Sequence, residues 1–187
     1  IPYCKQQCNY CNFYFRIAQN DKEGMLRSIK KEIKLRQSYL NGARISSIYF
    51  GGGTPSILNK EEIKSLIETI YNNFRIEPDA EITLECNPDD LDIKKLLELK
   101  EIGINRLSIG IQSFDDADLK FMNRSHNAKE ALSCIQFAKE SGFDNITIDL
   151  IYGLPNQSNE NWKKNLAKML SLDIQHFSAY SLTVEPK

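Results

Sequence analysis

Three cysteines near the start of the chain are the residues most able to do chemistry. Cys4, Cys8 and Cys11 follow a C-x3-C-x2-C spacing. Three thiolates on one short loop can bind three irons of a [4Fe–4S] cluster, which leaves the fourth iron without a protein ligand. A structural zinc site needs a fourth ligand, which Cys86 or Cys134 is available to supply, whereas three unligated thiols would be prone to oxidation. We interpret the loop as an iron–sulfur ligand set, with a zinc site as the alternative.

Further polar residues follow β-rich runs along the chain. A glycine-rich turn, Gly51–Thr54, comes directly after one run, and Glu85, Gln112 and Asp149 lie at or near the ends of others. Glycines let the backbone approach a ligand closely with its N–H and C=O groups free. Each of these residues also has an ordinary structural explanation, as part of a tight turn or as a strand-end group that neighbouring backbone satisfies.

The elements that must position these residues are alternating strands and helices. Helices are expected where apolar residues recur about every 3.6 positions: from Leu26 to Leu40, after Asn59, before Gly103, before Gly142 and over Trp162–Leu170. Asn59 with Glu62 resembles a capping box that starts the second of these helices. Strands are expected at Arg44–Phe50, Glu81–Cys86, Arg106–Ile111, Asn145–Ile151 and His176–Thr183.

This alternation predicts an α/β fold of βα units with a parallel sheet, either doubly wound or a (β/α) barrel. Polar groups follow four separate strands. In a barrel those groups converge at one mouth, whereas a doubly wound sheet gathers its ligands at one switch point. We therefore expect a barrel, open or closed, with its site at the carboxyl ends of the strands.

Composition limits the class of protein. The 187 residues are 41% apolar and 26% charged, enough for one domain with a buried core. The net charge of −1 gives no general attraction for nucleic acid or anionic lipid, and no apolar run is long enough for a membrane helix. We expect a reduced, cytosolic protein with Cys86 and Cys134 buried, structural roles for His126 and His176, and a chain truncated at both ends.

With Tyr10 before its third cysteine, the C-x3-C-x2-C motif resembles the signature of the radical S-adenosylmethionine (SAM) superfamily. The resemblance implies a [4Fe–4S] cluster bound by Cys4, Cys8 and Cys11, with SAM chelating the open iron. One-electron reduction would then cleave SAM to methionine and a 5′-deoxyadenosyl radical. It also implies a partial (β/α)6 barrel, with the first strand and the C-terminal part outside this chain, and one core domain over residues 1–187.

The order of the remaining motifs resembles the oxygen-independent coproporphyrinogen III oxidase family, from Ile1 to about Thr183. The motifs are YFGGGTP, LECNP, GIQSF, MNR and IDLIYGLP. The resemblance places Tyr10 beside the adenine of SAM and implies no particular catalytic residue. The amino acid end of SAM would be held by Gly52, Gly53, Thr54 and Glu85, and further SAM-contacting positions are matched by Gln112, Arg124 and Asp149.

Position 13 separates two branches of that family. The oxidases usually have another cysteine two residues after the third, whereas this chain has Phe13, and its closing run Ser178–Pro186 is closer to the heme chaperone (HemW-type) branch. The resemblance implies a heme chaperone, with heme as cargo, heme-accepting proteins and a flavodoxin- or ferredoxin-like electron donor as partners, and a location in the cytoplasm or peripheral at the membrane. Heme-binding residues are expected beyond Lys187.

Two alternatives remain open. The first is an oxygen-independent coproporphyrinogen III oxidase, which decarboxylates propionate side chains by radical chemistry. The second is a heme-trafficking protein whose cluster is only structural, since related barrels host different activities.

Overall fold

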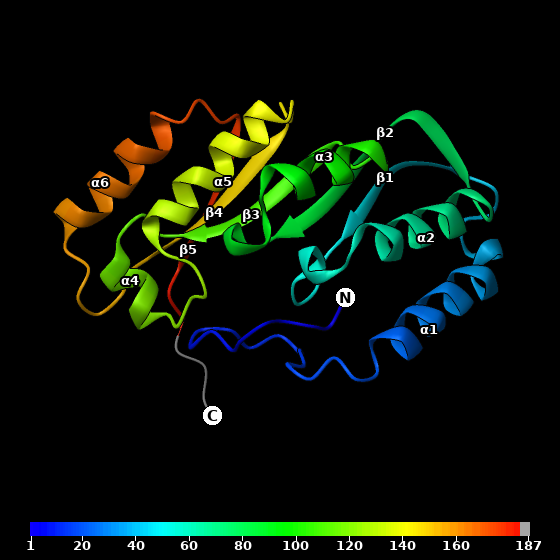
Figure 1. Ribbon diagram of the computed structural model, residues 1–187, viewed down its shortest axis with the longest axis horizontal. Helices are drawn as coiled ribbons and strands as arrows, with labels where there is room; N and C mark the ends of the chain where they lie inside the picture. Colours follow the sequence, from blue (N-terminus) through cyan, green and yellow to red (C-terminus); the bar gives the residue numbers. More distant parts are fainter. Residues whose placement is uncertain (184–187) are drawn as a thin grey trace.

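Five parallel strands form one curled sheet in the computed structural model, which describes residues 1–183 (Figure 1). The strands are β1 (Arg44–Phe50), β2 (Arg75–Cys86), β3 (Arg106–Gln112), β4 (Ile146–Tyr152) and β5 (His176–Ser181). Their order in the sheet is their order in the chain, and each pairs in parallel with the next. A doubly wound sheet reverses its order at a switch point, so the unbroken order confirms the expected partial barrel.

Helices alternate with the strands and lie on one side of the sheet. They are α1 (Lys22–Leu35), α2 (Lys60–Tyr71), α3 (Ile93–Glu101), α4 (Asp116–Phe121), α5 (Ala128–Glu140) and α6 (Asn159–Leu170). Figure 1 shows α3 and α5 in front of the strands, while the N-terminal segment, in dark blue, runs from the neighbourhood of α2 towards α4. Helix α1 precedes the sheet and contacts α2 through an ion pair of 2.9 Å between Lys22 Nζ and Glu62 Oε1.

The hydrophobic core lies between the sheet and these helices. Successive side chains of a strand point to opposite faces. On β3, Leu107, Ile109 and Ile111 are fully buried in the same apolar cluster as Leu96 of α3 and Ile135 of α5. The intervening residues of β3 are small or polar, so the face turned away from the helices is the polar inner wall of the half-barrel.

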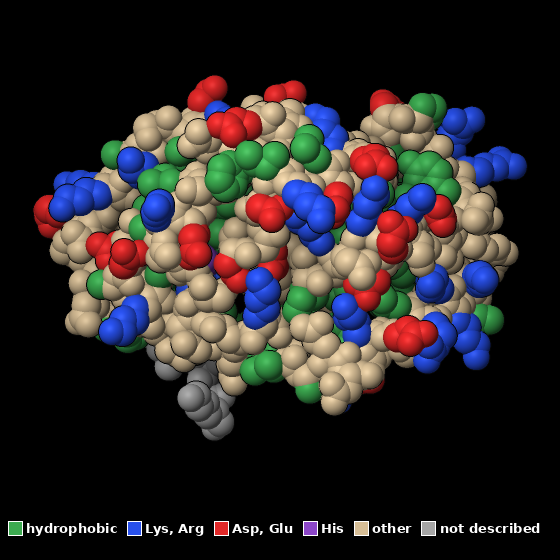
Figure 2. Space-filling view, viewed as in Figure 1, with side chains coloured by type: hydrophobic (Ala, Val, Ile, Leu, Met, Phe, Trp, Pro, Cys, Tyr) green, Lys and Arg blue, Asp and Glu red, His purple; other side chains and the backbone are tan. Residues whose placement is uncertain are grey.

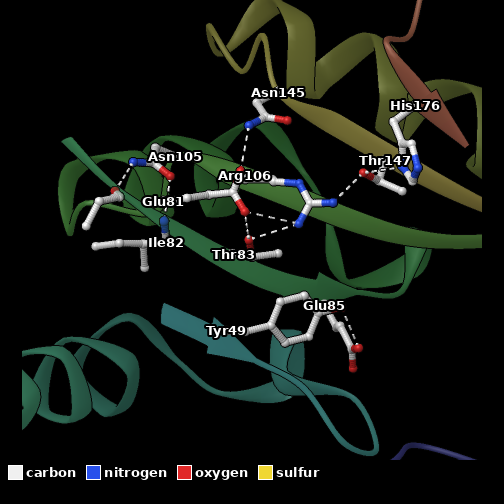
Figure 3. Close-up of polar contacts among 11 residues, drawn as sticks. Tyr49, Glu81, Ile82, Thr83, Glu85, Asn105, Arg106, Asn145, Thr147 and His176 are labelled. Atoms are coloured by element: carbon white, nitrogen blue, oxygen red, sulfur yellow. Dashed lines mark hydrogen bonds and ion pairs between the residues drawn. The ribbon is translucent and has the colours of Figure 1, made fainter. Parts of the chain in front are cut away.

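Arg106 lies at the centre of a polar network on this inner wall (Figure 3). Its guanidinium donates to Thr83 Oγ1 at 3.2 Å and to Thr147 Oγ1 at 2.8 Å, on the two neighbouring strands. It also forms an ion pair of 3.4 Å with Glu81, and His176 Nδ1 lies 3.2 Å from Thr147 Oγ1. The network therefore joins four strands, and the structural role expected for His176 is confirmed.

The sheet differs from the sequence-based prediction mainly at β2. This strand begins at Arg75, six residues before the predicted Glu81, because Arg75 and Ile76 pair with the start of β1 across an irregularity in the register. The other strand ends agree with the prediction to within two residues. The largest of these differences is at β5, which ends at Ser181 instead of Thr183. The end of the Ser178–Pro186 run lies outside the described residues.

The helices also differ from the prediction in two places. The first helix ends at Leu35, and the predicted extension to Leu40 is wrong because Gln37–Leu40 forms a separate 3₁₀ turn that ends at Asn41 with a φ of +49°. The short helix α4 has too few residues to show a helical apolar period, so the pattern did not predict it. Gly103 and Gly142 follow α3 and α5 with φ of +94° and +79°, as expected for helix ends.

The surface carries charges of both signs. Figure 2 shows Lys and Arg interspersed with Asp and Glu over the face it displays, without a large patch of one sign. Among residues 1–183, no helix combines the length and the apolar character that crossing a bilayer requires.

The capping box at the start of α2 provides a test of this fold. Asn59 Oδ1 accepts from the Glu62 backbone N–H at 2.9 Å, and Glu62 Oε2 accepts from the Asn59 N–H at 2.8 Å. We expect Asn59→Ala to lower the free energy of unfolding by about 0.5–2 kcal/mol, because it removes the first of these bonds. Urea denaturation measures the change. Asn72→Ala, at the exposed other end of α2, is the control, and an equal loss there would contradict the capping role.

Candidate cofactor site

The cysteine-bearing segment is held against the glycine-rich turn after β1. Gly53 N–H donates to Ile1 O at 2.8 Å and Thr54 N–H donates to Tyr3 O at 2.7 Å. A Cβ placed on Gly53 would lie 2.7 Å from Tyr3 O and 3.0 Å from Cys4 Sγ, so only glycine fits there. The turn therefore serves first to bring Cys4 close to the end of β1. The sequence predicted Gly53 as part of a turn near a ligand, but it did not reveal this close contact with Tyr3 and Cys4.

A clamp of hydrogen bonds joins the cysteine loop to the turn after α4. Asn9 Nδ2 donates to Phe121 O at 2.6 Å, and Asn123 Nδ2 donates to Gln7 O at 2.6 Å. Gln6 Nε2 in turn donates to Asn123 O. Asn123 has a φ of +54°, a left-handed conformation that asparagine tolerates better than most residues. The clamp therefore fixes the loop on both sides of Cys8.

Lys5 anchors the same loop to the 3₁₀ turn that follows β2. Its ammonium lies 2.9 Å from Asp89 Oδ2 and also pairs with Asp90. Asp89 Oδ1 accepts from Ser125 Oγ at 2.7 Å. One carboxylate thus connects the cysteine loop to the chain segment that also carries Arg124.

Arg124 connects the cysteine loop to the ends of two strands. Its Nη1 lies 3.1 Å from Tyr10 Oη and 3.4 Å from Cys8 Sγ. Its Nη2 donates to Asn87 Oδ1 at 2.8 Å and to Gly110 O at 2.9 Å. Within residues 1–183 the buried Nε has no hydrogen-bond partner. The guanidinium places a positive charge next to a sulfur, where a thiolate-bound cluster would bring negative charge.

All of the residues predicted for the cluster and for SAM line one cavity of about 770 Å³. The cysteines Cys4, Cys8 and Cys11 are half-buried in its wall. The others in the wall are Tyr10, Gly52, Gly53, Thr54, Glu85, Gln112, Arg124 and Asp149. The structure therefore brings together groups that are up to 145 positions apart in the chain, although their individual roles remain predictions.

Glu85 is held by hydrogen bonds to both of its carboxylate oxygens. Tyr49 Oη donates to Oε1 at 2.8 Å, as Figure 3 shows, and Gly52 N–H donates to Oε2 at 3.0 Å. Burial and the neighbouring carboxylate raise the pKa of Tyr49 to about 12, so its hydroxyl stays a donor at neutral pH. The sequence patterns did not single out Tyr49. The available signal was the alternation along β1, which turns Phe50 towards the helices and its neighbour Tyr49 towards the polar face.

Asp149 and Gln112 enter the cavity from β4 and β3. Asp149 lies in the middle of β4, not at its end, and burial raises the pKa of its carboxyl group, with the nearby Glu85 adding to the rise. Gln112 is buried, and a Cβ placed on Gly110 would lie 2.9 Å from Gln112 Nε2 and 3.5 Å from Arg124 Nη2. Gly110 therefore leaves the space that these two side chains occupy.

The remaining two cysteines belong to the hydrophobic core, as expected. Cys86 follows Glu85 on β2 and points to the helical side, and Cys134 lies on α5. Burial raises the pKa of Cys134 to about 12 and that of Cys86 well above its ordinary value, which opposes thiolate formation. Over residues 1–183, no three His, Cys, Asp or Glu side chains are close enough to hold a single metal ion. Although Cys86 also borders the cavity, both thiols are packed into the core, which argues against a zinc site shared with the loop.

The chain is similar in sequence to known proteins over nearly its whole length. The chain is 39% identical over 190 residues to the heme chaperone HemW of Bacillus subtilis (strain 168), covering 100% of this chain and 50% of that protein. It is 37% identical over 185 residues to radical S-adenosyl methionine domain-containing protein 1, mitochondrial, of Mus musculus, covering 98% and 42%. The chain thus spans about half the length of the curated relatives it matches.

A solved structure matches closely as well. Coproporphyrinogen III oxidase (HemN) from Escherichia coli, a radical SAM enzyme, superposes with a TM-score of 0.91 at 32% identity, over 100% of this chain and 43% of that chain. The sequence profile of the Radical SAM superfamily matches residues 1–169. A [4Fe–4S] cluster and SAM are the cofactors that this superfamily implies. The chain belongs to the radical SAM superfamily.

Proposed function

We propose that the full-length protein is a heme chaperone that carries a [4Fe–4S] cluster and SAM. The observation that carries the proposal is the single cavity in which the cysteine loop faces Glu85 and the glycine-rich turn. The similarity to HemW of Bacillus subtilis supports heme as the cargo. The proposal covers the whole protein, of which this chain is the part that would bind the cofactors.

The residues present fit these cofactors. A cavity of about 770 Å³ lies within the range of about 300–1,000 Å³ typical of small-molecule sites. Cys4, Cys8 and Cys11 would bind the cluster, which with SAM supplies one-electron chemistry when bound. Glu85, whose carboxylate is already oriented, would accept from the ammonium of SAM.

The other cavity residues would bind the rest of SAM. The turn at Gly52 and Gly53 would offer backbone groups to the amino acid end, next to the Thr54 hydroxyl. Arg124 would counter the negative charge of the thiolates and of the SAM carboxylate. Tyr10, with its ring in the cavity wall, would pack against the adenine.

The second candidate function is oxygen-independent coproporphyrinogen III oxidase. The superposition on HemN of Escherichia coli favours it. Against it stands Phe13, which has 77% of its surface exposed and lines the cavity where the oxidases usually have a further cysteine. We favour the chaperone because an exposed phenylalanine cannot replace a thiol in any redox or ligand role. A heme-trafficking protein with a purely structural cluster is the third candidate.

We infer further that residues 1–187 are part of one radical SAM core domain, because a single sheet and a single core run through the described elements. A reducing donor of the flavodoxin or ferredoxin type would supply electrons, and heme-accepting proteins would receive the cargo. The number and spacing of the cysteines, which do not resemble a disulfide scaffold, support a cytoplasmic location, including the cytoplasmic surface of a membrane. Nucleic acid is not an expected partner, given the net charge of −1 and the mixed charges on the face that Figure 2 displays.

Metal analysis tests the cluster ligands. Anaerobic reconstitution should give about four iron atoms per chain, and changing any one of Cys4, Cys8 or Cys11 to Ala should abolish cluster binding. Cys86→Ala and Cys134→Ala are the matched controls and should retain the iron, because both thiols lie in the core. Stoichiometric zinc that depends on Cys86 or Cys134 would contradict the proposed cluster.

Replacement of Glu85 by glutamine tests its role in SAM binding. Glu85→Gln keeps the shape of the side chain but removes its charge, and a lost charge-assisted hydrogen bond costs about 1.5–3 kcal/mol. SAM binding, measured by equilibrium dialysis on the reconstituted protein, should weaken roughly ten- to a hundredfold. Glu81→Gln is the matched control, since Glu81 is on the same strand and face but pairs with Arg106. Unchanged SAM affinity in Glu85→Gln would leave Glu85 with a structural role only.

Chaperone and oxidase are separated by assays of the full-length reconstituted protein. We expect it to bind heme, and not to convert coproporphyrinogen III to protoporphyrinogen IX. Binding is followed by heme absorbance and conversion by chromatography of the porphyrins. Complementation of a strain lacking both forms of the oxidase provides a second readout, in which restored growth would overturn the chaperone proposal and leave the cofactor site standing.

A further inference from the structure

The end of β3 contains a strained turn at a predicted SAM contact. Gln112 has a φ of +67°, and Ser113 N–H donates across it to Ile111 O at 2.9 Å. A three-residue turn closed by such a bond, with positive φ at its centre, is a γ-turn of the rarer and more strained kind. The pairing of β3 with β4 shifts register here. Strained backbone persists only where the surroundings hold it, and it is concentrated at functional sites.

His126 holds the carbonyl group on which this turn closes. Its Nε2 lies 3.0 Å from Ile111 O, and the side chain is buried, with 4% of its surface exposed. Burial, together with the charge of Arg124, lowers the pKa of His126 to about 4. The imidazole is therefore neutral at physiological pH and donates from Nε2. Its Nδ1 is buried and without a partner in the described part of the chain.

Two further buried side chains hold the other side of the turn. Ser113, which is fully buried, donates from Oγ to Asp118 Oδ2 at 2.8 Å. Asn165 Oδ1 accepts from the Phe114 backbone N–H at 2.6 Å. These bonds come from α4 and α6, while His126 comes from the segment between α4 and α5. The turn is therefore fixed from both flanks by residues that do not line the cavity.

The turn determines where the side chain of Gln112 lies. Its Nε2 folds back over Gly110, at 2.9 Å from the position of a Cβ on that residue, beside the Arg124 guanidinium. In this place the amide lines the cavity next to the cysteine loop. Relaxation of the turn to an ordinary strand or loop conformation would move the Gln112 side chain away from this position.

We propose that His126 is a positioning residue, which together with the Asp118 and Asn165 side chains holds the strained turn that directs Gln112 to SAM. The proposal rests on the proposed function, in which Gln112 contacts SAM. Nothing in the sequence pattern pairs position 126 with position 111, and His126 itself does not line the cavity.

The test measures SAM affinity and thermal unfolding of the full-length protein. SAM dissociation constants are determined by equilibrium dialysis after anaerobic reconstitution, and melting temperatures are measured on iron-free protein. His126→Leu removes the donor, while His126→Gln keeps an amide N–H near the place of Nε2. Gln112→Gly removes both the SAM contact and the strain. Ser141→Ala, which removes a buried hydroxyl at the far end of α5, is the control.

We expect His126→Leu to weaken SAM binding about three- to tenfold and His126→Gln to restore most of the affinity. In the Gln112→Gly background, His126→Leu should change SAM affinity less than about twofold, since the contact that it positions is already gone. Gln112→Gly should melt no lower than the unaltered protein. Glycine at an unstrained position would lower the melting temperature by about 2–4 °C.

Three results would overturn the proposal: unchanged SAM affinity in His126→Leu, an equal loss in both backgrounds, or a lower melting temperature for Gln112→Gly. If His126→Leu does not fold, His126→Asn, whose amide is too short to reach Ile111, takes its place in the same comparison. An unaltered protein that binds no SAM overturns the proposed function itself, and with it this role for His126. A protein that binds SAM normally while His126→Leu has no effect overturns the positioning role alone.

Discussion

The hydrogen bonds of Arg124 are the interaction on which the arrangement of the site depends. One guanidinium contacts the cysteine loop at Cys8 and Tyr10, the end of β2 at Asn87 and the carbonyl of Gly110 on β3. A cation in such a place is stable only where acceptors surround it, because removing a charge from water is costly. With its four acceptors in place, the same group that satisfies the strand ends also fixes the loop that would carry the iron.

The order of the strands explains why the site lies on the inner wall of the half-barrel. Because each strand lies next to its chain neighbour, the helices gather on one face and the apolar residues of every strand turn towards them. The opposite face is left for polar groups, which must be paired when buried. At the amino-terminal part of the strands the Arg106 network pairs them with one another. Towards the carboxyl ends they open onto the cavity, where ligand groups can replace such partners.

The sequence predicted the strands from local patterns, and it predicted the cavity residues from the cysteine spacing together with the resemblance to a known family. Alternating apolar runs located all five strands, and the cysteine spacing with the motifs around Glu85 and Gln112 identified residues that do line one cavity. The sequence could not show the contacts between distant segments. The clamp from Asn123 to Gln7 spans 116 positions, and the bond from His126 to Ile111 requires a turn that no composition signal marks. Tyr49 was not singled out because its partner, Glu85, lies on another strand.

Among the described non-glycine residues, the one with a costly positive φ, Gln112, lies where the cofactors would bind. Four described non-glycine residues have positive φ, and two of them, Gln112 and Asn123, border the cysteine loop or line the cavity. Asn41 and Asp173, the other two, lie in turns between elements, where asparagine and aspartate adopt this conformation at small cost. Glutamine does not share this conformational tolerance, so the strain at Gln112 must be offset by the bonds around it and by the core behind β3. Because those bonds come from the chain's own side chains, they would hold the turn in place for a cofactor. Preorganisation lowers the ordering cost of binding, which is the physical reason for a fold to tolerate strain at this one point.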